Sequence, residues 1–186
     1  NNNIIEITGC DDCGPGTKLL GSLDKLKKDS LLILVDDDNI YEDYMIEKFY
    51  EYYSYAPENA YSFYVHPLND FGIGQGADGF AINSNHLKGI KNFYEEVVKT
   101  NHNIFIHDDL WISFFLFYLK KTKILSLRSH LKKHNNEFEL IYRKHVNDQS
   151  LISGYGKNIN EAVKNRDQIA LKSIDYMFDK INQKKF

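Results

Sequence analysis

The sequence predicts an α/β fold with a mainly parallel sheet, flanked by helices and followed by a C-terminal helix. Short apolar runs alternate with amphipathic stretches of about 10 to 15 residues, which is the pattern of strand–helix–strand units. The run from Leu31 to Val35 is entirely apolar, as expected of a strand buried on both faces of a parallel sheet. With 186 residues, including 13 tyrosines and 12 phenylalanines, the chain can build one substantial core.

The individual elements follow from spacing and from turn residues. Leucines at helical spacing predict a helix over Thr17 to Lys28, and Asn160 is the expected N-cap of a last amphipathic helix that ends near Ile181. Residues 1–157 are expected to form one domain, with residues 158–186 packed on it as that helix. The predicted strands are Ile4 to Thr8, Leu31 to Val35, Ala60 to Val65, Phe80 to Asn83 and Ile124 to Leu127; the other predicted helices are Asp43 to Tyr55, Leu87 to Lys99 and Leu110 to Lys121, and Asp70 to Gly79 is a glycine-rich loop.

Composition excludes several classes of function. A net charge of −3 gives no basic surface for a nucleic-acid backbone, so we expect no nucleic-acid partner. The longest apolar run, Leu110 to Leu119, is about half as long as a membrane helix, so we expect no membrane span.

No signal peptide is evident, which favours a cytoplasmic location. The chain begins with Asn1 rather than Met, so we expect either trimming or excision from a longer protein.

The two cysteines suggest a competing function. Cys10 and Cys13 stand between a predicted strand and a predicted helix, which is the position of a thioredoxin-type redox motif. Asp11 and Asp12 separate them and oppose formation of a thiolate, so we expect two free thiols instead.

Three aspartates follow the apolar strand directly. In an extended chain, Asp36 and Asp38 point to one side, about 6.6 Å apart, and Asp37 points to the other. Adjacent carboxylates repel each other by about 1 kcal/mol per pair in water, so a compensating cation is expected. Ligands of open α/β sheets bind beyond the carboxyl ends of strands. The cluster therefore predicts a divalent-ion site, and a solvated acidic turn is the alternative.

A second acidic pair, Asp108 and Asp109, precedes the predicted helix from Leu110. Carboxylates in the first turn of a helix are stabilised by its dipole, so the pair could simply cap the helix. A carboxylate at a helix start beside a pocket is also well placed to accept a proton. The sequence leaves both interpretations open.

Four segments together resemble the nucleotide-sugar glycosyltransferases of the GT-A fold, most closely the small bacterial and large-virus members. In chain order, these segments are GPGTKLL (Gly14 to Leu20), ILVDDDNIY (Ile33 to Tyr41), GADGFAI (Gly76 to Ile82) and HDDLWIS (His107 to Ser113). Their order and spacing match as well as their residues do. The resemblance covers residues 4–150, so it implies that residues 1–157 form the catalytic domain.

The resemblance also implies roles for individual residues. Asp36 and Asp38 match the ends of the DxD motif: Asp38 would bind Mn²⁺ or Mg²⁺, and Asp36 would contact the ribose or the metal shell. Asp109 matches the base of inverting members, and Asp108 would position acceptor hydroxyls. His145 is the candidate for a further metal ligand, with His130 and His134 as rivals. The residues expected on the nucleotide and donor-sugar side are Gly14, Lys18, Asp36, Asp37, Gly76 and Gly79.

The function implied by the resemblance is metal-dependent transfer of a sugar. The donor would be a nucleotide diphosphate sugar, with UDP as the expected nucleotide, and the acceptor a hydroxyl group of a glycan or another molecule, with inversion at the anomeric carbon. One departure is that only one predicted strand precedes Gly14, so the N-terminal nucleotide-binding unit is expected to be short or missing. A non-catalytic nucleotide-sugar-binding module and a metal-dependent phosphotransferase remain as alternatives.

Overall fold

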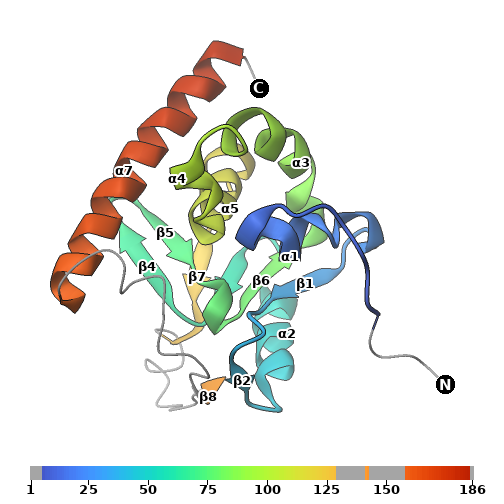
Figure 1. Ribbon diagram of the computed structural model, residues 1–186. Helices are drawn as coiled ribbons and strands as arrows, with labels where there is room; N and C mark the ends of the chain where they lie inside the picture. The colour runs from blue at the N-terminus through green and yellow to red at the C-terminus, as the bar shows by residue number, and fades with distance from the viewer. Residues whose placement is uncertain (1–5, 129–140, 143–157, 185–186) are drawn as a thin grey trace.

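The computed structural model describes residues 6–128, 141–142 and 158–184, and these have an α/β architecture (Figure 1). Within them, the main sheet has four strands in the order β1-β6-β3-β7. Strand β6 runs antiparallel to both of its neighbours, whereas β3 and β7 run parallel. The strands are β1 (Leu31–Leu34), β3 (Ala60–Ser62), β6 (Phe80–Asn83) and β7 (Ile124–Ser126).

The expectation of a mainly parallel sheet is wrong, because β1–β6 and β3–β6 are antiparallel pairs. Strand β1 lies at the edge of this mixed sheet. Its apolar sequence arises because Leu32 and Leu34 pack in the larger hydrophobic cluster, whereas Leu31 and Ile33 pack in the smaller one. Alternate residues of a strand face opposite sides of the sheet. A continuous apolar run therefore indicates packing on both faces but not the direction of the neighbouring strands.

Helices cover both faces of the sheet, as the sequence predicted (Figure 1). Helix α2 (Met45–Tyr55) covers one face and buries Met45 and Phe49 in the smaller cluster, beside Tyr61 and Ala81 of the sheet. The helices α3, α4 and α5 lie together over the other face and supply much of the larger cluster. They are α3 (Ile90–Phe93), continued by the π-helical turn η5 (Tyr94–Val98), α4 (His102–Phe105), and α5 (Asp108–Phe114), continued by the π-helical turn η6 (Phe115–Leu119).

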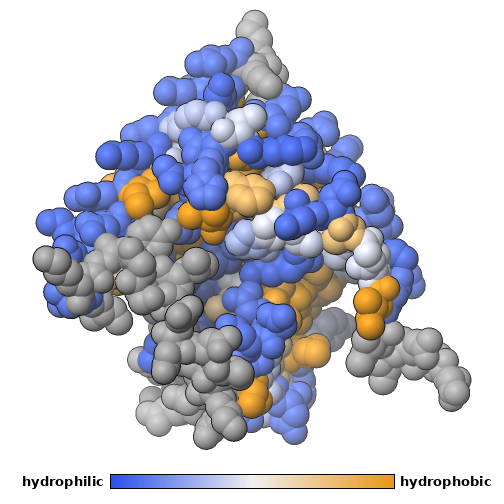
Figure 2. Space-filling view, in the orientation of Figure 1, coloured by the Kyte–Doolittle hydropathy of each residue, from blue (hydrophilic) through white to orange (hydrophobic). Residues whose placement is uncertain are grey.

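The C-terminal helix α7 (Ile159–Lys184) is present as predicted. Its apolar side contributes Ala170, Ile174 and Met177 to the larger cluster, and Figure 2 shows a mostly hydrophilic outer surface over it. The N-cap differs from the prediction, because the Asn158 side chain accepts the Glu161 N–H at 3.0 Å. None of the described helices combines the length and apolar composition needed to cross a membrane.

Several predicted elements differ from the structure. The strand predicted over Ala60 to Val65 ends at Ser62, as β3. The helix predicted from Thr17 begins there but ends after one turn, as α1 (Thr17–Leu20), and a 3-10 turn, η2 (Leu23–Lys25), follows. Ser22 lies between them, and its hydroxyl donates to the Leu19 carbonyl, which competes with helical bonding. In the first predicted strand, the described residues 6–8 have no strand conformation.

The sequence analysis missed two strand pairs. Strand β4 (Val65–Leu68) pairs with β5 (Phe71–Gly74) in an antiparallel hairpin, so part of the predicted glycine-rich loop is a strand. Asn69 turns the hairpin with a φ of 54°, a conformation that asparagine tolerates better than most residues. A second pair joins β2 (Ile40–Tyr41) to β8 (Ile141–Tyr142).

Candidate functional site

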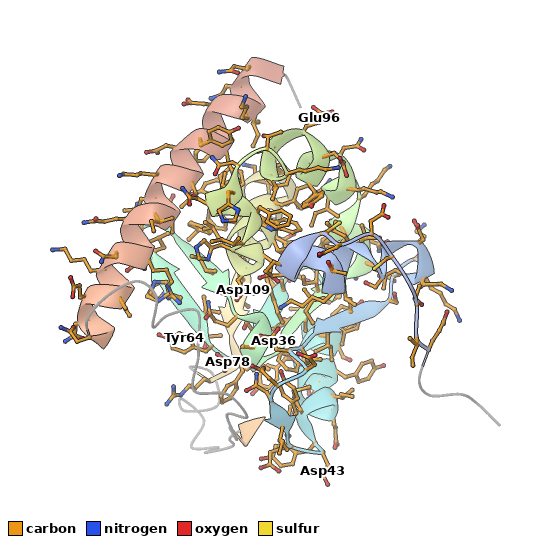
Figure 3. The ribbon with its side chains drawn as sticks, in the orientation of Figure 1. Asp36, Asp43, Tyr64, Asp78, Glu96 and Asp109 are labelled. Atoms are coloured by element: carbon orange, nitrogen blue, oxygen red, sulfur yellow. The ribbon has the colours of Figure 1, made fainter. Side chains whose placement is uncertain are left out.

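A cavity of about 560 Å³ opens beyond the end of β1. Its walls come from five regions: the end of β1, the segment that leads into α1, the β4–β5 hairpin, the start of α5, and α7. Figure 3 shows Asp36, just after β1, and Asp109, in the first turn of α5, close together near the centre of the molecule. Its charged lining residues are Asp36, Asp37, Asp108, Asp109, Asp167, Lys18 and Arg166.

The turn after β1 is held in place by Tyr41. The Tyr41 hydroxyl accepts the Asp36 N–H at 2.9 Å, and its own proton is shared between the carbonyls of Asp36 and Ala77, at 3.2 and 3.1 Å. Asn39 adds a side-chain N–H to the same Ala77 carbonyl at 3.3 Å. These bonds tie the acidic turn to the 3-10 turn η3 (Gly76–Asp78) and so fix the backbone that carries Asp36.

Glycines bring Lys18 to the cavity. The 3-10 turn η1 (Gly14–Gly16) lies so close to α4 and α5 that side chains would not fit. A Cβ at Gly16 would lie 2.7 Å from the ring of Trp111, and one at Gly14, where φ is +60°, would lie 2.6 Å from the ring of Phe105. Close packing of this turn on α5 places Lys18, in the first turn of α1, beside the start of α5.

Lys18 lies between the two acidic segments. Its Nζ is 2.6 Å from Asp36 Oδ1 and 3.0 Å from Asp108 Oδ2. Burial opposes the charged ammonium, but the charges of Asp108, Asp36 and Asp109 outweigh that cost and raise the pKa of Lys18 above its ordinary value. Lys18 is therefore a fixed positive charge between the end of β1 and the start of α5.

Asp109 contacts the backbone of Gly76. The Gly76 N–H donates to Asp109 Oδ1 at 2.8 Å. Burial and the neighbouring Asp108 raise the pKa of Asp109 to about 8, although Lys18 and the Gly76 N–H oppose that change. Asp109 therefore retains a proton near neutral pH in the folded protein. A proton acceptor with a pKa in this range suits acid–base catalysis.

Gly76 has no room for a side chain. A Cβ there would lie 2.8 Å from Lys18 Nζ and 3.1 Å from Asp109 Oδ1. The GADGFAI segment therefore brings its backbone directly against the lysine and the acidic pair. The structure thus brings five of the predicted site residues into the lining of one cavity: Lys18, Asp36, Asp37, Asp108 and Asp109. A sixth, Gly76, contacts Lys18 and Asp109.

Other predicted site residues lie elsewhere. Asp38 is exposed, and its Oδ1 accepts a hydrogen bond from the Asn39 side chain at 3.2 Å. Gly79, with a φ of +87°, faces the core, where a Cβ would lie 2.8 Å from the Phe49 ring. Gly14 packs against Phe105, as described above. His145 and its rivals His130 and His134 lie outside the described residues.

No preformed group of three metal-binding side chains occurs within the described ranges. The two described candidates, Asp36 and Asp38, supply carboxylate oxygens, which suit Mg²⁺ or Mn²⁺. Such ions often bind through one or two carboxylates together with the phosphates of a substrate. The donor chemistry therefore fits an ion that arrives with a diphosphate. Cys10 and Cys13 are free thiols, as expected.

The sequence analysis missed the wall that the hairpin and α7 contribute. His66 comes from β4, and its Nε2 lies 2.8 Å from Asp167 Oδ1 on α7. Arg166 and Ala170 of α7 line the cavity as well. No local pattern marks these residues, because their position depends on how α7 packs across the molecule.

Comparisons of the chain with protein-family models, with curated protein sequences and with solved structures found no match. The function is therefore inferred from the residues of this cavity and from the sequence motifs that contribute them.

Proposed function

We propose that this protein transfers a sugar from a nucleotide diphosphate, with UDP as the expected nucleotide, to a hydroxyl group of a glycan or another acceptor, with inversion. One observation carries the proposal: Asp36 from a strand end and Asp108 from a helix start meet at Lys18 on the wall of one cavity. These residues come from three of the four segments that resemble GT-A glycosyltransferases. Gly76, from the fourth, donates its N–H to Asp109.

The charge of the cavity supports a ligand that carries a cation. Five aspartates line the cavity, against one lysine and one arginine. Carboxylates gathered beside a low-dielectric wall repel each other, and Lys18 compensates only part of that charge. Mn²⁺ or Mg²⁺ would be held by Asp36 in the cavity lining and by Asp38, the exposed acid two residues further on, together with the diphosphate. When bound, the ion would act as a Lewis acid that neutralises the charge developing on the leaving phosphate.

Asp109 is the proposed base. The acceptor oxygen forms a bond to the anomeric carbon, the bond from that carbon to the phosphate oxygen breaks, and the hydroxyl proton passes to the Asp109 carboxylate. The diphosphate leaves with the bonding electron pair. The Gly76 N–H at 2.8 Å orients the carboxylate, and the raised pKa of Asp109 makes it a stronger proton acceptor than an exposed aspartate.

Lys18 and Asp108 have supporting roles. The Lys18 ammonium lies beside Asp36, where it can also contact an oxygen of the diphosphate. Asp108 pairs with Lys18 and lines the same cavity, so it can position both the lysine and an acceptor hydroxyl. Neither role requires the side chains to leave the positions described here.

The test of this function is calorimetric titration of UDP into the protein with and without Mn²⁺. UDP should bind only when Mn²⁺ is present, and Asp38→Asn should abolish the metal-dependent binding. Asp43→Asn is a matched control, because Asp43 is exposed and lies apart from Asp36 and Asp109 in Figure 3. If UDP binding is the same with and without Mn²⁺ in the wild type and in Asp38→Asn, the metal assignment is wrong.

Incubation with UDP-sugars and Mn²⁺ then distinguishes the classes of function. Transfer to an acceptor, or slow metal-dependent hydrolysis of the donor, is expected of the proposed enzyme. Metal-dependent binding with neither reaction would instead indicate a binding module. Release of inorganic phosphate without release or transfer of the sugar would indicate a phosphotransferase.

A further inference from the structure

Two groups of side chains of different chemistry line the cavity. In the first, aspartates from the end of β1 and the start of α5 pair with Lys18. In the second, α7 contributes Arg166, β4 contributes His66, and His107 lies within reach of the charge of Arg166. In Figure 3, Asp109 and Asp36 lie near the centre of the molecule, and α7 runs along one side.

Arg166 is the basic residue that α7 contributes to the cavity lining. Within residues 6–128 and 158–184, no carboxylate forms an ion pair with it. The neighbouring acid on α7, Asp167, is held by His66 at 2.8 Å. Burial and the charge of Arg166 lower the pKa of His107. Because His107 is then neutral, Arg166 is the permanent positive charge of the pair.

Apolar side chains complete the lining of the cavity. Ile73 of β5, Ile106 and Leu110 beside the acidic pair, and Ala170 of α7 all line the cavity. An apolar wall with a few polar groups is the usual composition of a small-molecule site, and it suits the hydrophobic face of a sugar ring. A planar guanidinium can hold a carboxylate or phosphate through two parallel hydrogen bonds.

The place of Arg166 in the cavity lining indicates which ligand it contacts. The proposed function places the donor diphosphate at Lys18 and Asp36, which pair with each other. Arg166 comes from α7, and its charge acts on His107, whereas the acids that pair with Lys18 are Asp36 and Asp108. A group bound by Arg166 therefore contacts a different part of the lining from the donor diphosphate, and the acceptor is the ligand left for that part. We infer that Arg166 binds an anionic group, a carboxylate or a phosphate, on the acceptor sugar, so that the acceptor is an acidic glycan. This inference rests on the proposed function.

Saturation-transfer NMR with metal-free protein can test the anion site directly. The probes are glucose, glucuronate and glucose 6-phosphate, which separate a neutral sugar from a carboxylate and from a phosphate. Wild-type protein should bind one or both of the anionic sugars roughly tenfold more tightly than glucose. Arg166→Gln should lose this preference while binding glucose unchanged. Lys164→Gln is the matched control, because Lys164 is an exposed cation on the same helix outside the cavity lining.

A parallel titration of UDP with Mn²⁺ distinguishes the two proposals. Arg166→Gln should bind UDP as the wild type does, and a comparable loss of UDP affinity would place Arg166 at the donor diphosphate and overturn the acceptor assignment. The anion site is also overturned if the wild type shows no anionic preference, or if Arg166→Gln retains it. Arg166-dependent binding of anionic sugars, with no binding of UDP at all, would support the anion site and reject the proposed transfer.

Discussion

The Nζ of Lys18 lies 2.6 Å from Asp36 Oδ1, and this contact connects the first described helix to the end of β1. The same Nζ is 3.0 Å from Asp108 Oδ2, so one lysine compensates carboxylates from two distant segments. Without it, the buried Asp108 would face Asp109 and Asp36 with like charge. The geometry of the candidate site therefore depends on a residue that precedes both acidic motifs.

The first prediction concerns Lys18→Ala. Removing the ammonium leaves Asp108 buried without its ion-pair partner, so the free energy of unfolding at pH 7 should fall by about 1 to 2 kcal/mol. Binding of UDP with Mn²⁺ should weaken by a similar amount if Lys18 also contacts the diphosphate. Chemical denaturation and calorimetry measure the two effects. The loss of stability should shrink at acid pH, where protonated carboxyl groups need no counter-ion.

Lys25→Ala is the control for Lys18→Ala. Lys25 pairs with Glu6 on the surface, where both side chains are more than half exposed. Surface ion pairs contribute little to stability, so this variant should match the wild type in both measurements. Equal UDP affinity in Lys18→Ala and the wild type would remove Lys18 from the nucleotide site.

The second prediction separates the two neighbouring acids. Asp109→Asn should reduce the transfer rate by roughly 10²- to 10⁴-fold, because it removes the base without changing the size of the side chain. Its affinity for UDP and Mn²⁺ should barely change, since the base contacts the acceptor. Asp108→Asn should have a smaller effect on the rate. If Asp108→Asn loses activity while Asp109→Asn retains most of it, the roles are reversed; if both remain active, the pair serves only as a helix cap.

The third prediction concerns stability as a function of pH. The pKa of Asp109 is raised in the folded protein, so the native state retains a proton that the unfolded chain has already lost. Stability should therefore fall as pH rises from about 4, the unfolded pKa, to about 8, the folded one. Asp109→Asn carries no charge at this position, so denaturation curves across this range should show a flatter pH dependence, by about 1 kcal/mol or more.

Two variants make this third measurement specific. Asp24→Asn changes an exposed acid on η2 and should retain the wild-type pH dependence. Asp108→Asn should also flatten the curve, because the charge of Asp108 helps to raise the pKa of Asp109. A curve for Asp109→Asn that parallels the wild type, with a flattened one for Asp108→Asn, would place the proton on Asp108.

The fourth prediction concerns Gly76→Ala. The new methyl group would lie 2.8 Å from Lys18 Nζ, so the flexible end of Lys18 must move away from Asp36 and Asp108. Overall stability should change by less than about 1 kcal/mol, because only a side-chain end is displaced. Affinity for UDP with Mn²⁺ should fall roughly tenfold, since the cation leaves its place at the end of β1.

Gly9→Ala provides the comparison for Gly76→Ala. A Cβ at Gly9 meets no atom within 4 Å, so this variant should bind UDP as the wild type does. Unchanged UDP affinity in Gly76→Ala would mean that the position of the Lys18 ammonium is unimportant for the donor. A large loss of stability would mean that the backbone around Gly76 moves instead of the lysine.

The sequence predicted most of the elements that carry the site. The apolar run from Leu31 and the amphipathic pattern of α7 are local signals, and both elements form where they were expected. The positions of Asp36, Asp108 and Asp109 at a strand end and a helix start also follow from the sequence. The distances from Lys18 to Asp36 and to Asp108, which show that these acids lie close together, come only from the structure.

Sheet topology could not be predicted in the same way. The β1 run is apolar because helices pack on both faces of the sheet, and this pattern is the same whether the neighbouring strand is parallel or antiparallel. The pairing of β1 with β6, from Leu31 opposite Asn83 to Leu34 opposite Phe80, is a long-range choice between segments. Strand β5 was not predicted because its sequence is rich in glycine, which has a low strand propensity.

By itself, the sequence determined where charge and apolar surface lie along the chain, because periodicity and turn residues act over a few neighbouring positions. Tertiary structure alone decided that Lys18 compensates Asp36 and Asp108, and that His66 of β4 meets Asp167 of α7. Such pairs depend on the packing of elements far apart in the chain. No local pattern shows which helix face will close a cavity, so only the folded molecule brings Arg166 into the lining that contains Asp36 and Asp109.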